Sequence, residues 1–425
     1  MQLTHIHVSI LSPEILIITQ QNTDTLTSFS CRSNRLRKDQ EAQGLWCRQL
    51  FFILEMVPNL TEFALGPVIL LDPPNQEFNK ICKNLKTLEL DRIKVSLPSL
   101  YSDSVTAEAE SVIMESFPRL ESLALIWNDF PPQCQLELIR KSPNLKSLIW
   151  RRGTKLLAES WLSGTLAVPQ ELSMLDIGNS HLEDEDMGRL LALIPSLTAL
   201  NARSTPFSSN SLAQLVNNQG PDMVELELME CTSLTSEQIQ TILTSMPKLK
   251  RFSASLLEAS DFFISNGNTG LEAVDGLGSS VAQGASAGPW VCLGLEELEI
   301  SIIGPEVCEE TDLARYASAV YDQLGKLRQL RVLSLKEITS DYRDHGPLLD
   351  LTLENGLGFL SSLKYLRELN IRGISAKMDK AEVEWIAREW TRLIAIKGPL
   401  NSVPGVNAKD LNHQLKRLLP AAVVL

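Results

Sequence analysis

The chain has 425 residues, of which 44% are hydrophobic, and its formal net charge is −13. This is the composition of a globular protein with enough apolar residues for a large core. The acidic balance disfavours general nucleic-acid binding, which requires a basic surface. The apolar run from Glu14 to Thr19 is too short to span a membrane, and the first residues lack the basic start of a signal peptide.

The cysteines point to a reducing compartment. There are seven, scattered and without a C-x-x-C pair, which favours free thiols over a disulfide framework. We therefore expect a cytoplasmic protein, with the nucleus as the alternative.

In chain order, residues 4–10 predict a strand and residues 12–21 predict a helix, so the repeat pattern starts at the first residues. We expect that the sequence is a fragment, or that another element covers this end. His5 and His7 would share one face of the strand. They could ligate a metal, but no cysteine or second histidine pair accompanies them, so ordinary strand positions are favoured.

An L-x-x-L-x-L frame, with conservative apolar replacements, then recurs thirteen times. Its period-2 alternation predicts a short strand in each copy, and the apolar positions between the frames have helical spacing. The first apolar residue of each frame, called its anchor below, is Leu26, Leu60, Leu85, Leu120, Leu145, Leu172, Leu197, Met223, Leu249, Leu295, Leu330, Leu366 or Leu393.

The copies between Leu182 and Leu249 are the most regular. Their anchors are 26 residues apart, and a proline ends each helical segment. A period in the twenties with this alternation is the signature of a leucine-rich repeat. The predicted fold is an α/β leucine-rich-repeat solenoid over residues 1–425, with about 13 irregular repeats. We expect a curved horseshoe with parallel strands on its concave face and helices on its convex face.

Two local patterns support the repeat. Thr235 followed by Gln238 fits a capping box at a helix start. The acids at 183–186 suit the N-terminal end of a helix, and the alternative is a metal or basic-partner site. Regular repeats of this class carry asparagine or cysteine eight residues after the anchor. In this chain only Asn34, Asn128, Cys231 and Asn401 follow that rule.

Residues 265–289 interrupt the pattern with a Gly/Ser/Ala-rich tract that predicts a disordered insertion. Ser286 lies there in a G-x-S-x-G string, but a nucleophile elbow needs a strand before it and a helix after it. An enzyme hidden in the insertion is thus the least favoured hypothesis. We expect no catalytic residue, no metal and no cofactor. Residues 400–425, with a helix from Ala408 to Leu419, predict a C-terminal cap.

The remaining candidate for function is a surface. Residues between and beside the leucines of each frame point away from the core, so they line the concave face. Charged residues at these positions are ordinary on a solvated face and equally suit a binding face. Trp127, Arg151 and Arg152 lie at or just after the predicted strand ends, and tryptophan and arginine are the residue types commonest as interface anchors. The candidate partner-binding residues are Glu89, Asp91, Trp127, Arg151, Arg152, Asp176, Arg203, Glu225, Glu227, Arg251, Glu297 and Glu299.

The P-x-L-x-x-L-x-L strands, the irregular spacing and helices such as LTSEQIQTIL resemble the leucine-rich-repeat region of F-box proteins, the substrate-recognition subunits of cullin-type ubiquitin ligases. That resemblance implies a non-catalytic protein-binding scaffold that presents substrates for ubiquitination. The family's F-box would precede the repeats, where we expect no room for it, so binding of the ligase adaptor requires an F-box upstream. The alternative is a regulator of a small GTPase. That family has more regular repeats and an acidic tail, whereas this chain ends in AAVVL.

Overall fold

A computed structural model describes residues 2–9, 13–32, 49–50, 52–70, 83–95, 116–129, 132–151, 155–259, 289–304, 310–335, 349–372, 374, 376–403 and 408–424. Its contacts divide the chain into two units. The N-terminal unit comprises Met1–Leu182 and Arg189–Leu200, and the C-terminal unit comprises Glu183–Gly188 and Asn201–Leu425.

The predicted frames all form strands. Each of the thirteen starts two residues after its anchor, and a further strand at either end completes one 15-stranded sheet in chain order. These strands are β1 (His5–Val8), β2 (Ser28–Cys31), β3 (Glu62–Leu65), β5 (Thr87–Asp91), β7 (Ser122–Ile126), β8 (Ser147–Arg151), β9 (Met174–Asp176), β10 (Ala199–Asn201), β11 (Glu225–Leu228), β12 (Arg251–Glu258), β13 (Glu297–Ile303), β14 (Val332–Leu335), β15 (Glu368–Asn370), β16 (Ala395–Lys397) and β17 (Val423–Val424). A second, two-stranded sheet pairs β4 (Val68–Leu70) with β6 (Ile93–Val95).

The registers of the large sheet are parallel wherever they are described, so equivalent positions of successive repeats are neighbours. A recurrent pair of backbone hydrogen bonds precedes most strands of the large sheet. In one example the N–H groups of Lys250 and Arg251 both donate to the carbonyl of Val224, at 2.8 and 3.1 Å. The same pair of bonds joins Glu296 and Glu297 to the carbonyl of Lys250. The predicted α/β fold with parallel strands is confirmed, whereas the curvature and the single domain over 1–425 stay predictions.

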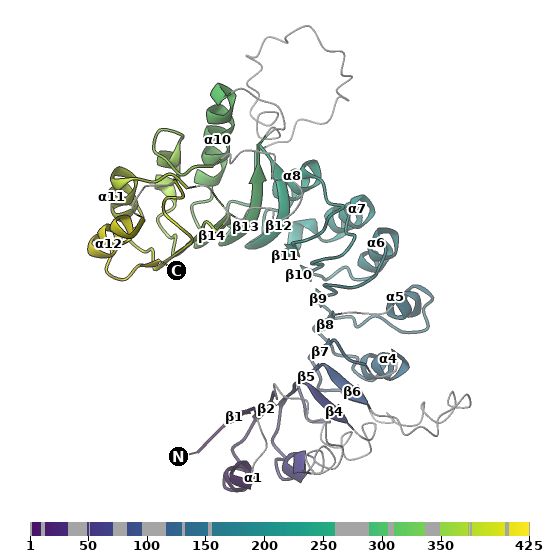
Figure 1. Cartoon of the computed structure of the whole chain (residues 1–425). Helices are drawn as coiled ribbons and strands as arrows, with labels where there is room; N and C mark the ends of the chain where they lie inside the picture. Colours follow the sequence, from purple (N-terminus) through teal and green to yellow (C-terminus); the bar gives the residue numbers. More distant parts are fainter. Residues whose placement is uncertain are drawn as a thin grey trace. The chain divides into compact units, whose positions relative to one another are not determined.

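Helices alternate with the strands. They are α1 (Pro13–Gln20), α4 (Pro132–Arg140), α5 (Lys155–Leu162), α6 (Asp184–Ala192), α7 (Ser209–Asn218), α8 (Ser236–Ser245), α10 (Glu310–Gly325), α11 (Lys380–Glu389) and α12 (Ala408–Leu418), with 3-10 helices η2 (Gly220–Asp222) and η3 (Leu357–Ser362). Within the C-terminal unit, α7, α8 and α10 lie on the same side of β11–β14 (Figure 1). None of these three helices lies on the other side of the strands, which we call the open face (Figure 1).

The core lies between the helices and the strands. In β11 the side chains of Leu226 and Leu228 are buried, and in α8 those of Ile239, Ile242 and Leu243 are completely buried. The predicted capping box of α8 is confirmed, because the side chains of Thr235 and Gln238 each accept from the other residue's backbone N–H.

The turn after the strand has a repeated backbone conformation. The residue seven positions after the anchor is left-handed in five repeats, at Arg92, Trp127, Asn179, Ser204 and Glu230, with φ between 52° and 63°. Left-handed backbone is costly for residues other than glycine, by roughly 1–2 kcal/mol. The recurrence shows that the repeat geometry imposes it.

The next residue in the repeat fastens that turn. Asn128 donates to the carbonyl of Leu90 and accepts from the N–H of Ile93, both at 2.8 Å. The thiol of Cys231 donates to the carbonyl of Ala202 at 3.1 Å, and Asn401 donates to the carbonyl of Met378 at 2.7 Å. Asn34 lies outside the described residues. The side chains of Asn128, Cys231 and Asn401 therefore bridge neighbouring repeats.

The predicted insertion, apart from Pro289, and with it Ser286, lies outside the described residues. At the C-terminal end, α12 packs on α11, and β17 pairs in parallel with β16. Among the described helices, none is long and apolar enough to cross a membrane.

Candidate binding surface on the open face of the sheet

Strands β11, β12 and β13 of the C-terminal unit present two rows of outward side chains. The apolar residues between them, Leu226, Phe252 and Leu298, enter the core, so alternate residues face the open side. By register, the first row is Glu225, Arg251 and Glu297, and the second row is Glu227, Ser253 and Glu299. We call these six residues the acidic face. Five of the twelve sequence-predicted site residues are therefore brought together here, and Arg203 lies close by.

The first row contains its own cation. Arg251 forms an ion pair with Glu225, and the side chains are 50% and 40% exposed. By register Arg251 also stands next to Glu297, which is exposed on the adjacent strand. The arginine is thus placed between two carboxylates. An ion pair this exposed contributes little to stability, on the order of 0–1 kcal/mol.

A second ion pair borders the acidic face. Arg203 pairs with Glu230, whose other carboxylate oxygen accepts from the Ser204 hydroxyl at 2.5 Å. The hydrogen bond with Glu230 is the largest influence on Arg203 and raises the pKa of its guanidinium; the charges of Glu227 and Glu299 act in the same direction. Arg203 is therefore held at Glu230 but within electrostatic range of the second row.

Ser253, rather than a cation, occupies the middle of the second row. Its side chain is only 6% exposed, and its hydroxyl has no hydrogen-bond partner among the described residues. Glu227, on one side, accepts from the backbone N–H of Met229 at 3.3 Å. Buried hydroxyl groups are usually hydrogen-bonded, so an unpaired one in the middle of a charged row needs an explanation.

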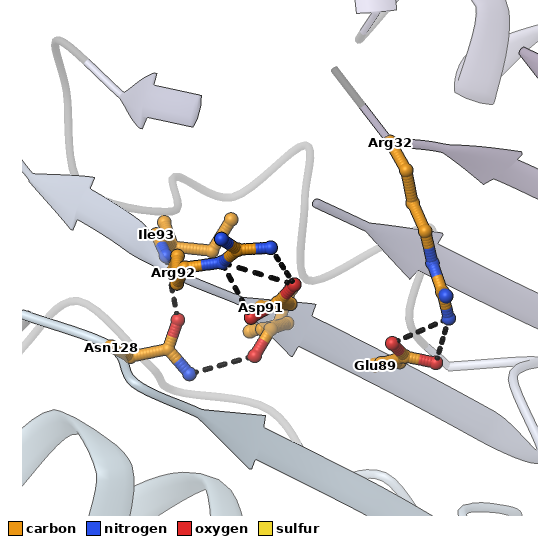
Figure 2. A network of polar contacts seen from close by, with 7 residues as sticks. Arg32, Glu89, Asp91, Arg92, Ile93 and Asn128 are labelled. Carbon is orange, nitrogen blue, oxygen red and sulfur yellow. Dashed lines mark hydrogen bonds and ion pairs between the residues drawn. The ribbon is translucent and has the colours of Figure 1, made fainter. Parts of the chain in front are cut away.

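In the N-terminal unit, the predicted acids are engaged within the chain. Both carboxylate oxygens of Glu89 accept from Arg32, at 2.6 and 2.7 Å. Asp91 pairs with the neighbouring Arg92 at 3.1 Å (Figure 2). Figure 2 also shows Asn128 next to Ile93 beside this pair, and its amide also donates to the carbonyl of Leu90. Glu89 and Asp91 keep only 25% and 16% of their side chains exposed.

Asp176 lies at an outward position of β9, opposite Ile149, but it is buried. It is 2% exposed, because its carboxylate turns back to accept from the N–H of Gly178 at 3.0 Å and from Arg151 at 2.9 Å. A short acid two residues before a turn readily makes such a local bond. Arg151 remains 39% exposed. Arg152 lies outside the described residues.

Trp127 is 38% exposed and adopts the left-handed turn conformation. In the N-terminal unit, the equivalent outward positions of β7 and β8, which we also call open face, are apolar near Trp127, and the selection of charged residues from the sequence missed them. Ala124 pairs with Ile149 and Ile126 with Arg151, and both isoleucines are half-buried. Selecting every residue between the leucines, rather than the charged ones, would have found this patch.

Among the described residues, the side chains most often used as metal ligands or nucleophiles are histidines, cysteines and acids. No group of three or more His, Cys, Asp or Glu side chains there could hold a metal. His5 and His7 lie in β1 opposite Ser28 and Ser30 of β2. The thiols of Cys31, Cys231 and Cys292 are buried, and burial raises the pKa of each, to about 11 for Cys31 and about 12 for Cys292. Thiols with raised pKa values are poor nucleophiles.

Neither a protein-family model nor a curated protein matches the chain. Among solved structures, an internalin, InlF, from Listeria monocytogenes is 11% identical, with 87% of this chain and 81% of that chain covered and a TM-score of 0.44. The functional domain of InlJ from Listeria monocytogenes is 13% identical, with 97% of this chain covered and a TM-score of 0.36. The chain spans 66% of the length of that InlJ domain. The leucine-rich-repeat architecture described here rests on the strands and registers given above.

Proposed function

We propose that the chain is a non-catalytic protein-binding scaffold that contacts its partners through the open face of its sheet. The observation that carries this proposal is the alignment of outward residues across parallel strands. In the C-terminal unit it forms the acidic face, and in the N-terminal unit it forms the apolar patch of Ala124, Ile126 and Ile149.

The two patches carry the apolar and charged side chains that are common in protein interfaces. Apolar side chains half-exposed beside an exposed tryptophan provide area to bury, and such residues commonly dominate binding free energy. Charged groups around them set partner choice and association rate more than affinity. A rigid sheet also holds these groups without the entropy cost of ordering loops on binding.

Affinity capture from a cell lysate tests this proposal. The open-face variants are Ile149→Arg and Glu297→Lys, and the control is Glu384→Lys on α11, whose side chain is exposed outside the strands. Circular dichroism first establishes that each variant is folded. We expect each open-face variant to lose bound proteins that the original chain and the control retain. Retention of all bound proteins by both open-face variants would overturn the proposal.

The finer form of the proposal is substrate recognition for a cullin-type ubiquitin ligase. It is supported by the sequence resemblance to F-box repeat regions, together with a sheet in which thirteen of the fifteen strands lie in the predicted frames. Quantification of the ligase adaptor among the captured proteins tests this form, using the protein expressed from its full reading frame. Absence of the adaptor from the proteins captured in that experiment would contradict the ligase role and leave the scaffold proposal standing.

A further inference from the structure

The two rows of the acidic face have the same plan except at their centres. The first row reads carboxylate, guanidinium, carboxylate, at Glu225, Arg251 and Glu297. The second row reads carboxylate, hydroxyl, carboxylate, with Ser253 at the centre. The chain thus supplies a cation between one pair of glutamates and a small hydroxyl between the other pair.

The spacing of the second row suits a cation. Parallel strands lie about 4.8 Å apart, so Glu227 and Glu299, which flank Ser253, have their backbones about 10 Å apart. Each glutamate side chain can lean inward by a few ångströms, which brings both carboxylates within hydrogen-bond reach of one group above Ser253. The ion pair of Arg251 with Glu225 shows that a basic side chain is accommodated at this height in the neighbouring row.

The charge around Ser253 is strongly negative. Five carboxylates belong to the acidic face and its border, at Glu225, Glu227, Glu230, Glu297 and Glu299, against the guanidinium groups of Arg203 and Arg251. Each arginine already has a glutamate partner, Glu230 and Glu225 respectively. A further cation would therefore lower the electrostatic repulsion among these acids.

The buried hydroxyl indicates where that cation goes. Ser253 is almost completely buried, with only 6% of its surface exposed. Its hydroxyl oxygen has no hydrogen-bond partner among the described residues. Leaving such a group without a hydrogen bond is unfavourable in the free protein. A donor placed above it would satisfy the oxygen, and ammonium and guanidinium groups are donors without acceptor capacity.

From these observations we propose that the second row is a recognition site for a lysine or arginine side chain of a partner protein. The basic group would lie between Glu227 and Glu299 and donate a hydrogen bond to the Ser253 hydroxyl. It would complete in the second row the arrangement that Arg251 completes in the first. The proposal rests on the scaffold function above and specifies the chemistry of the partner.

A metal ion fits this site less well than a basic side chain. Divalent cations require several oxygen ligands at roughly 2.0–2.6 Å, and these carboxylates come from backbones about 10 Å apart. The described residues contain no cluster of three or more His, Cys, Asp or Glu side chains that could hold a metal ion. A side-chain cation, in contrast, needs contacts of only about 2.7–2.9 Å to each carboxylate and brings its own long stem.

The first experiment measures binding of acetylated hexalysine and hexaarginine peptides by isothermal titration calorimetry. Acetylated hexaglutamate is the reference, and the measurements are made at about 50 and about 200 mM salt. We expect the basic peptides to bind, more weakly at the higher salt, and hexaglutamate not to bind. No binding of either basic peptide would overturn the proposal.

The decisive variant is Ser253→Arg, which places a guanidinium at the centre of the second row. We expect it to fold and to lose at least tenfold in affinity for the basic peptides. Its matched control is Thr241→Arg on α8, which changes net charge equally at an exposed position on the helical side. We expect the control to retain binding within about twofold. Equal affinity of the two arginine variants would overturn the proposal.

A second set of variants serves if Ser253→Arg does not fold. One double variant carries Glu227→Gln and Glu299→Gln. The control double variant carries Glu354→Gln and Glu384→Gln, at exposed positions outside the acidic face. We expect at least a tenfold loss of affinity only in the first pair. Ser253→Ala should also weaken binding while leaving the unfolding midpoint unchanged or higher, because it removes an unpaired hydroxyl. A merely structural serine would lower the midpoint.

The outcomes separate this inference from the scaffold proposal. If Glu297→Lys and Ile149→Arg lose protein partners but the peptides bind every variant equally, the lysine or arginine site is wrong and the scaffold stands. If the peptides behave as expected but no protein is lost from the open-face variants, the site exists and the scaffold proposal fails.

Discussion

Asp184 and Ser211 hydrogen-bond to each other across neighbouring repeats. The backbone N–H of Ser211 donates to the carboxylate of Asp184 at 3.1 Å, and the Ser211 hydroxyl donates to the backbone carbonyl of Asp184 at 3.0 Å. The same carboxylate accepts from the N–H groups of Ser208 and Asn210, at 2.8 and 2.9 Å. Ser208, at the N-cap of α7, makes no side-chain cap of its own. One repeat therefore caps the helix of the next.

The first prediction concerns this cap. Asp184→Ala should lower the free energy of unfolding by about 1–2 kcal/mol, since it leaves N–H groups at the start of α7 without their acceptor. Urea denaturation monitored by circular dichroism measures the loss. The control is Glu185→Ala, at an exposed position in the first turn of α6. Equal effects of the two substitutions would contradict the cap.

The cap should also depend on pH. Burial acts to raise the pKa of Asp184, but the hydrogen bonds from Ser211, Asn210 and Ser208 outweigh it, and the net effect lowers the pKa. Because the folded pKa lies below the unfolded one, the resulting stability is fully present above the unfolded pKa of about 3.9 and is lost as pH falls through the folded pKa.

Comparison of the original chain with Asp184→Asn reveals this dependence. The difference between their free energies of unfolding should be constant from about pH 7 to about pH 5 and should shrink below about pH 4. Urea denaturation at a series of pH values measures the difference. A difference that does not change with pH would show that the carboxylate charge has no role in the cap.

Gly398 should be intolerant of a side chain. Its φ is +114°, and a Cβ there would lie 2.9 Å from the backbone nitrogen of Arg372 and 2.9 Å from the backbone carbon of Ile371. Gly398→Ala should therefore cost more than about 1 kcal/mol of unfolding free energy. Gly294→Ala is the matched control, because a Cβ at Gly294 would meet no atom within 4 Å. Thermal denaturation distinguishes them, and similar midpoints would refute the prediction.

At a left-handed turn position, a glycine variant should be more stable than an alanine variant, which is the reverse of the order in a helix. Arg92 has a φ of 52° and an exposed side chain, so Arg92→Gly should be more stable than Arg92→Ala by about 1 kcal/mol. In a helix the order is reversed. Ala213→Gly in α7 should lower the free energy of unfolding by about 1 kcal/mol. Chemical denaturation of the four proteins tests this, and an Arg92→Ala variant more stable than Arg92→Gly would contradict it.

The local features of the repeat could be predicted because they depend on residues close in sequence. Strand positions follow from alternation over a few residues, so every frame was located. The capping box of Thr235 and Gln238 spans three residues, and it forms as predicted. The acid run beginning at Glu183 was placed at a helix start, and Asp184, Glu185 and Asp186 occupy the first turn of α6. The bonds from Asp184 to α7 could not be predicted, since they link residues 24–27 apart.

The candidate surface was predictable only as a set of positions. The frame shows that Glu225, Glu227 and Arg251 leave the core, and the structure places them on one face. The frame does not show which of these side chains form ion pairs or hydrogen bonds within the chain. Asp176 is buried and bonded to Gly178 and Arg151, and Glu89 is bound by Arg32, a residue 57 positions away.

The sequence by itself thus determined the repeat, its strands and the residues that enter the core, because alternation and helical spacing are local properties of a chain. Only the tertiary structure decided that Ser253 lies between Glu227 and Glu299 with its hydroxyl unpaired. Those three residues come from strands separated by 26 and 46 residues from anchor to anchor, and the second interval contains the insertion. Their proximity is set by parallel register, which aligns equivalent positions whatever length of chain connects them.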